Sequence, residues 1–285
     1  MSTKTLPQLL SLLLLTLLGT LLSVLFLPLF SLVSGYSMAE INEDVELLRL
    51  VQFVSASCMF LAPGLIFARL HSADAWDFLH LRTKLPIRGL LLGLGGLFLL
   101  SPLVSLTTYL NESLSLPSFL APIEEWMRAQ EDSTKSLVQK FFVVGGMGEF
   151  VQNVVVISLM AGLSEEVFFR GALQRIMERA TRNPHLVIWA TAAIFSAIHL
   201  QFYGFLPRMI LGAFLGYLLL WTGSLWVPIL VHAANNLLSI VVMSSESLKA
   251  NDLFSGELQA SDVPGYLFAS VLGLLAFYYC ARKRS

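Results

Sequence analysis

The chain has 285 residues, of which 56% are hydrophobic and only 13% are charged. A typical soluble domain carries about 25% charged residues, so this composition excludes an ordinary soluble protein and predicts a polytopic membrane protein. The formal net charge is −1, and the sequence contains neither a glycine-rich phosphate loop nor a basic stretch with interleaved aromatic residues. Binding of nucleotides or nucleic acids is therefore unsupported.

Long apolar runs predict an all-α bundle of about eight transmembrane helices, with seven as the nearest alternative. About 20 residues cross the hydrocarbon core as a helix. The first run is longer than the apolar core of a signal peptide, about 7–15 residues, so we expect it to be retained. The fifth and sixth runs are short, and we expect them to be tilted or only partly embedded. In chain order the runs cover residues 7–33, 47–69, 88–110, 150–172, 186–202, 207–222, 225–243 and 264–281.

The distribution of charge predicts the orientation of these helices. With the N-terminus in the cytoplasm, the inner segments hold 12 of the 18 basic residues, and the outer segments hold 14 of the 19 acidic residues. Basic residues accumulate on the cytoplasmic side of membrane proteins, so both termini are expected to be cytoplasmic. In this count Arg49, Arg208 and Glu131 belong to outer segments. Residues 118–140, also outside, mix apolar and charged side chains, which is typical of an interfacial amphipathic helix and equally of an ordinary helical loop.

Two adjacent carboxylates, Glu165 and Glu166, interrupt the fourth apolar run. A charged side chain inside a bilayer costs about 2.5–3.5 kcal/mol on insertion scales, so packing alone does not explain the pair. Arg170 follows Glu166 at i+4, the favourable order for an ion pair on a helix, and Glu165 is rotated from Glu166 by about 100°. Glu166 and Arg170 are therefore predicted to support the structure, which leaves Glu165 for function. The alternative is a cytoplasmic helix end with solvated charges.

Two further polar groups lie in later runs. His199 lies near the end of the fifth run, and His232 and Asn236 share one face of the seventh at i and i+4. Each group alone could serve packing or hydrogen bonding between helices. A carboxylate, two imidazoles and a carboxamide on three helices can satisfy one another by converging, so we expect a polar cavity in the inner half of the bilayer, open to the cytoplasm.

These side chains, without a Ser or Cys nucleophile among them, suit the activation of a water molecule. Glu165 is predicted to be the general base, and His199 to share the water or protonate the leaving amine. His232 and Asn236 are predicted to donate hydrogen bonds to an oxyanion. The alternative is zinc or another divalent metal held by Glu165, His199 and His232. The spacing His-x-x-x-Asn is not the His-Glu-x-x-His zinc motif, so the sequence does not specify a metal.

Three motifs in this order resemble the CPBP family of intramembrane proteases, also called the Abi family. The family includes type II CAAX prenyl endopeptidases and proteins of bacteriocin processing or self-immunity. The resemblance covers about residues 148–240, and its motifs are Glu165-Glu166-x-x-x-Arg170, Phe195-x-x-x-His199 and His232-x-x-x-Asn236.

The resemblance implies an all-helical membrane bundle and a role for each motif residue. Glu165 would activate the water together with His199, while His232 and Asn236 would stabilise the oxyanion. Glu166 and Arg170 would support them, and the mechanism would require no cofactor. The chain would then divide into N-terminal helices and an outer amphipathic segment (1–147), the catalytic core (148–245), and an outer loop with a C-terminal transmembrane helix (246–285).

The sequence thus predicts an intramembrane endopeptidase that hydrolyses a peptide bond by glutamate- and histidine-activated water. Its partners would be the lipid bilayer and a peptide or lipid-anchored protein substrate, with no nucleic acid. It would be an integral, multi-pass protein, of the plasma or inner membrane if the source is bacterial. The alternatives are a proton-coupled transporter, because intramembrane Glu and His also mark ion pathways, and a non-catalytic immunity or scaffold protein.

Overall fold

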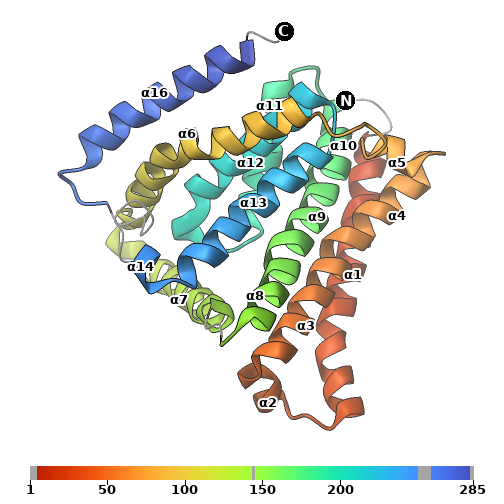
Figure 1. The fold of residues 1–285 in the computed structure, drawn as a ribbon. Helices are drawn as coiled ribbons and strands as arrows, with labels where there is room; N and C mark the ends of the chain where they lie inside the picture. The colour runs from red at the N-terminus through yellow and green to blue at the C-terminus, as the bar shows by residue number, and fades with distance from the viewer. Residues whose placement is uncertain (1–4, 143–144, 250–257, 283–285) are drawn as a thin grey trace.

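The computed structural model describes residues 5–142, 145–249 and 258–282. Within these ranges every regular element is a helix, and the helices form one bundle (Figure 1). The predicted all-helical fold class is therefore confirmed.

Within the described residues, six helices are long and apolar enough to cross a membrane. Two shorter apolar helices, Pro184–Ala197 and Val263–Phe277, correspond to the fifth and eighth predicted runs. The sixth run, which was expected to be short, belongs to a helix of sufficient length. The chain is thus a multi-pass membrane protein, whereas eight crossings and cytoplasmic termini remain predictions. The six long helices are Thr5–Ser34, Val45–His71, Ile87–Glu112, Met147–Glu178, Phe202–Thr222 and Trp226–Met243.

The first half of the chain forms three of these long helices and the elements that join them. Helix α1 is the first span, and α6 is the third. The second span consists of α3 and α4 joined by a π-helical turn, η1. The bounds are α1 Thr5–Ser34, α2 Met38–Glu43, α3 Val45–Ala56, η1 Ser57–Leu61, α4 Ala62–His71, α5 Ala75–Phe78, α6 Ile87–Glu112, η2 Ser118–Leu120 and α7 Ala121–Phe142.

The second half begins with the helical rod Met147–Glu178, in which two π-helical stretches flank the short helix α9. Glu165 and Glu166 are the last two residues of α9, and π-helical turns occur often at functional sites. The bounds are α8 Met147–Asn153, η3 Val154–Met160, α9 Ala161–Glu166, η4 Val167–Gln174, α10 Arg175–Glu178, α11 Pro184–Ala197, η5 Phe202–Gly204, α12 Phe205–Thr222, α13 Trp226–Met243, α14 Glu246–Lys249 and α16 Val263–Arg282.

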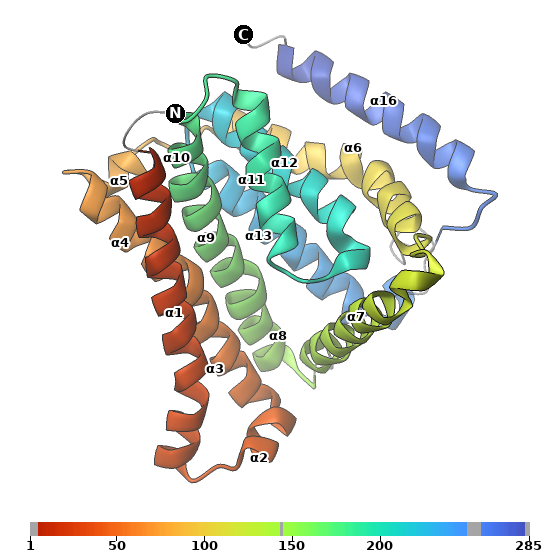
Figure 2. The ribbon, with the colours of Figure 1, turned by 180° about the vertical axis from the view of Figure 1, so that it is seen from behind.

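The rod lies between two groups of helices. Helices α1, α3 and α4 pack on one side of it, and α11, α12 and α13 lie on the other, as both views show (Figure 2). Helices α9 and α13 approach each other closely at Gly162. A Cβ atom at this position would lie 3.1 Å from both the Ala233 nitrogen and the Ile229 carbonyl oxygen. The absence of a side chain at Gly162 therefore lets the backbones of α9 and α13 touch, one turn before the two glutamates.

Two helices lie at the edge of the bundle. Helix α16 packs against α6 at the rim, and α7 lies at the end of the bundle that also carries α2 (Figure 1). The predicted amphipathic helix of residues 118–140 is present as α7, with Glu131 and Phe141 as its buried side chains. Its position at the membrane interface remains a prediction.

Three charges that were assigned to outer segments are withdrawn from the protein surface, wholly or in part, by helix packing, and the side of the membrane on which they lie remains a prediction. Arg49 is only 4% exposed and donates hydrogen bonds to Asn153 Oδ1 at 2.9 Å and to Gln152 Oε1 at 2.8 Å. Glu131 is buried as well, and Arg208 is partly buried. Position relative to an apolar run therefore did not reveal which charges face the interior.

Candidate active site

Glu166 and Arg170 form the predicted ion pair, in the interior of the bundle. Arg170 Nη1 lies 2.6 Å from Glu166 Oε1, and both side chains are at most 1% exposed. Arg170 Nη2 donates a second hydrogen bond to the Gly212 carbonyl oxygen at 2.7 Å. The guanidinium also lies over the ring of Phe195, 4.8 Å from its centroid. The pair therefore ties the rod to α11 and α12.

His232 joins this pair from α13 and contacts both glutamates. Its Nδ1 lies 2.8 Å from Glu166 Oε1, and its Nε2 lies 3.9 Å from Glu165 Oε2. An ionised carboxylate only accepts hydrogen bonds. Nδ1 of His232 therefore carries a hydrogen atom and donates a hydrogen bond to Glu166. The neutral ring then presents a lone pair on Nε2 toward Glu165. His232 can donate to an oxyanion through Nε2 only as an imidazolium, a condition that the spacing of the motif did not reveal.

Glu165 differs from its neighbour in both exposure and bonding. Its side chain is 16% exposed, whereas that of Glu166 is fully buried. Among the described residues Glu165 has no side-chain hydrogen bond, and its Oε2 lies 3.9 Å from Nε2 of His232. This carboxylate is therefore free to bind a water molecule.

His199 follows the end of α11, where Leu200 adopts a left-handed backbone conformation with φ of 53°. Its Nδ1 lies 2.7 Å from the Phe195 carbonyl oxygen, and its ring packs edge-on against the Phe195 ring. A carbonyl oxygen only accepts, so Nδ1 carries the proton and the neutral ring keeps a lone pair on Nε2. His199 is therefore held in the tautomer that can accept a proton.

Asn236 does not bond to the other predicted site residues. Its Nδ2 donates to the Ile157 carbonyl oxygen at 3.1 Å, in the π-helical stretch η3. The expectation that the four polar groups satisfy one another directly was thus wrong for His199 and Asn236. Backbone carbonyls supply their partners. One N–H of the Asn236 amide remains for another acceptor, since the group carries two.

Glu165 lies close to the middle of the rod. It comes 13 residues before Glu178, the end of the rod, which corresponds to about 20 Å at the rise of an α-helix. Arg170, assigned to the inner basic cluster, is buried. The position of the site in the inner half of the bilayer remains a prediction.

The segment between α11 and α12 is held by side chains that the sequence analysis left out. Asn111, at the end of α6, donates from Nδ2 to the Phe202 carbonyl oxygen at 2.6 Å and accepts from the Leu206 N–H at 3.0 Å. Glu131 of α7 accepts from the Tyr203 N–H at 3.4 Å. Asn111 lies near the end of an apolar helix and Glu131 lies in the middle of the amphipathic α7, and polar side chains are common at both kinds of position. The only available signal was an asparagine inside a membrane helix.

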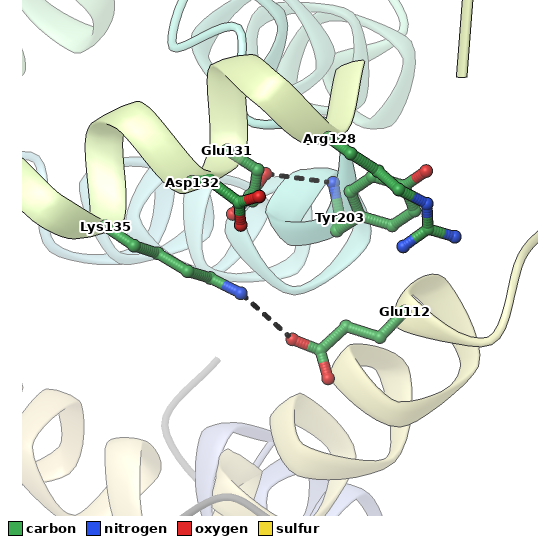
Figure 3. A pocket seen from close by; sticks show the side chains of 6 residues that line it. All are labelled: Glu112, Arg128, Glu131, Asp132, Lys135 and Tyr203. Carbon is green, nitrogen blue, oxygen red and sulfur yellow. Dashed lines mark hydrogen bonds and ion pairs between the residues drawn. The ribbon is translucent and has the colours of Figure 1, made fainter. Parts of the chain in front are cut away.

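A cavity of about 310 Å³ opens between α7, the end of α6 and this segment (Figure 3). Tyr203, four residues after His199, forms part of its wall. Lys135 points across it toward Glu112, at 3.9 Å between the charged atoms, and Arg128 lies over the Tyr203 ring. The lining residues are Glu112, Arg128, Glu131, Asp132, Lys135 and Tyr203.

The predicted alternative of a metal held by Glu165, His199 and His232 does not fit this arrangement. Among the described residues, no three His, Cys, Asp or Glu side chains gather closely enough to hold a metal ion. A zinc site needs three or four such ligands around one point. We therefore derive no step through a metal, and the prediction of a cofactor-free mechanism stays a prediction.

Residues 148–238 match the family model described as type II CAAX prenyl endopeptidase Rce1-like. The match confirms the resemblance to the CPBP family over this range, and all six predicted site residues lie within it. It supports peptide hydrolase activity of the CAAX-protease type. In the structure the matched residues run from α8 to α13, so this CAAX-protease-like core contains the rod and the three helices that complete the site.

A curated relative is the uncharacterized protein YpbD of Bacillus subtilis (strain 168). It is 28% identical over 86 residues, which cover 29% of this chain and 41% of that protein. The alignment thus spans less than half of the relative's length. No solved structure matches the chain.

Proposed function

We propose that this protein is an intramembrane endopeptidase that hydrolyses a peptide bond of a membrane-associated peptide or lipid-anchored protein. The observation that carries the proposal is the difference in burial and hydrogen bonding between two adjacent carboxylates. Glu166 is buried and bound by Arg170 and His232, whereas Glu165 is partly exposed and has no hydrogen bond among the described residues. A carboxylate that is held near two imidazoles but left unbonded suits a general base.

In the first step Glu165 takes a proton from a water molecule, and the water oxygen bonds to the carbonyl carbon of the substrate. The carbonyl oxygen becomes an oxyanion. The unused N–H of the Asn236 amide is one donor for it, and Nε2 of His232 is a second when the ring is protonated.

In the second step the C–N bond breaks and the leaving nitrogen gains the proton that the water lost. Glu165 or His199 delivers that proton, since Nε2 of His199 is free to receive it and pass it on. The products are a carboxylic acid and an amine, which exchange a proton to give a carboxylate and an ammonium group, and both side chains return to their starting states.

The test compares Glu165→Gln with the wild-type protein in detergent micelles, using a prenylated peptide that carries three residues after the modified cysteine. We expect Glu165→Gln to lower the cleavage rate by about 10²–10⁴-fold, because the amide cannot accept the proton. Its unfolding temperature and peptide binding should stay as in the wild type, since Glu165 has no structural hydrogen bond.

Comparison of C-terminal peptide fragments in cells that carry wild type or Glu165→Gln extends the test to natural substrates. Undiminished cleavage by Glu165→Gln would overturn the proposal. So would a wild type that cleaves neither the peptide nor any membrane protein but moves protons in vesicles.

A further inference from the structure

Arg208 carries a hydrogen-bond donor, Nη1, that has no partner among the described residues. It lies in the first turn of α12, on the segment that follows His199. Its Nη2 donates to Gln201 Oε1, a neutral amide oxygen. Its Nη1 is buried and has no hydrogen-bond partner among the described residues. No carboxylate lies within 4.0 Å of the guanidinium in the part of the chain that the structure describes.

The charges of Glu131 and Glu165 both act on the guanidinium, although neither carboxylate pairs with it. Glu131 lines the cavity of Figure 3, and Glu165 is the carboxylate left free in the site. Gln201, which accepts the hydrogen bond from Arg208, comes two residues after His199, so Arg208 lies beside the segment that carries this predicted site residue.

A comparison with Arg170 shows how differently the two guanidinium groups are satisfied. Arg170 places Nη1 against Glu166 and Nη2 against the Gly212 carbonyl oxygen, so its burial is compensated by an ion pair. A buried charge without a partner is unfavourable by several kcal/mol. Arg208, in contrast, has a neutral partner on Nη2 and none on Nη1 among the described residues.

The position of the guanidinium is fixed by its surroundings. Gln201 holds one end, and a Cβ atom at Gly204 would come within 3.1 Å of Nη2, so the absence of a side chain there leaves room for the planar group. Asn111 in turn bonds to Phe202 and Leu206, which lie on either side of Gly204. A guanidinium held in this way is preorganised to bind a planar anion through its free edge.

We propose that Arg208 binds a carboxylate group of the substrate close to the scissile bond. This inference rests on the proposed peptidase function and adds the substrate chemistry, a peptide with a free carboxylate near the cut. The carboxylate can be the C-terminus of the chain or the side chain of an Asp or Glu. In either case Arg208 selects the substrate and does not take part in proton transfer.

The experiment uses two pairs of prenylated peptides. One pair differs only in a C-terminal carboxylate or carboxamide, and the other has Asp or Asn next to the scissile bond with an amidated C-terminus. Binding is measured with full-length protein carrying Glu165→Gln, so that cleavage does not interfere. The same protein with Arg208→Gln or Arg208→Lys is compared, and Arg82→Gln serves as the control, because Arg82 is exposed and paired with Asp74.

We expect one pair to show about tenfold or greater preference for the carboxylate form, because a site built for a polar group rejects an analogue that lacks it. Arg208→Gln should lower affinity for the carboxylate form to that of the neutral form and leave the neutral form unchanged. Arg208→Lys should keep part of the preference, since lysine retains the positive charge but lacks the two parallel N–H donors of a guanidinium. The pair that responds identifies the source of the carboxylate.

Equal affinity for both members of both pairs would overturn the inference. So would an equal loss on the acid and neutral peptides in Arg208→Gln, which is the result expected if Arg208 only positions Glu165. Peptidase function is read separately, from cleavage by protein that retains Glu165. A wild type that binds acid peptides through Arg208 but cleaves none would therefore contradict the proposed function alone.

Discussion

The site has two sides that differ in how their charges are satisfied. On the closed side, Arg170 and His232 each bond to Glu166 within 2.8 Å, and all three side chains are nearly excluded from solvent. On the open side, Glu165, His199 and Arg208 share no hydrogen bond with one another among the described residues.

The difference shows how one helix separates structure from chemistry. Adjacent residues on a helix point about 100° apart, so one glutamate can face a guanidinium on its own helix while the next faces a neighbouring segment. The closed side fixes the backbone positions, and the open side keeps the polar atoms that a substrate can use.

Removing the arginine of the closed side should have the largest effect on stability. Arg170→Met leaves the buried Glu166 without its arginine and with only the hydrogen bond from His232, and breaking a buried ion pair destabilises a protein by about 3–5 kcal/mol. We expect a large fall in the unfolding temperature in detergent and a loss of folded protein in the membrane. The double variant with Glu166→Gln should recover part of the stability. An unfolding temperature equal to that of the wild type would show that the pair is not structural.

A change at Gly162 should disturb both sides of the site together. Gly162→Ala places a Cβ against backbone atoms of α13, which cannot move aside as a side chain would. We expect a loss of about 1–3 kcal/mol in stability, as for other overpacked positions. Activity should also fall, because α13 carries His232. Gly95→Ala is the matched control, since a Cβ there meets nothing within 4 Å. Equal behaviour of the two variants would contradict the close approach of α9 and α13.

Loosening the open side alone should have a smaller effect. Asn111→Ala removes two hydrogen bonds to the segment between α11 and α12, each contributing about 0.5–1.5 kcal/mol. We expect a modest fall in stability and a clear fall in activity, because the segment carries His199 and Arg208. Thermal unfolding and peptide cleavage measured on the same preparation check this. A variant that loses stability but keeps full activity would show that activity does not depend on these two hydrogen bonds.

The smallest effect is expected far from both sides. Arg82 and Asp74 form an exposed ion pair on the loop before α6. Exposed pairs of this kind contribute little, so Arg82→Gln should leave stability and cleavage unchanged within error. A loss of cleavage in this variant would mean that the loop contacts the substrate.

The sequence predicted the parts of the site that depend on local spacing. The Glu166–Arg170 pair follows from an i, i+4 relation on one helix, and the apolar runs located each helix to within a few residues. The bond from His232 to Glu166 joins residues 66 positions apart and depends on the approach of two backbones at Gly162. No spacing in the sequence contains that information.

Other residues were missed for a different reason. Arg208 lies at the start of an apolar run, where hydropathy assigns a charge to the membrane surface. Burial there is produced by α6 and α7, which come much earlier in the chain. The roles assigned to Glu165, His199, His232 and Asn236 remain predictions, now with defined partners for three of these side chains.

The two π-helical stretches around α9 have a consequence for the length of the chain. A π-helical turn accommodates one more residue than an α-helical turn over the same span. Loss of a single residue from Val154–Met160, with a return of that stretch to α-helical winding, would therefore leave the orientation of Glu165 nearly unchanged. The same loss from the α-helical stretch Ala161–Glu166 has no wide turn to absorb it and would rotate the residues on its two sides relative to each other by about 100°. The rod therefore tolerates a change of length at some positions and not at others.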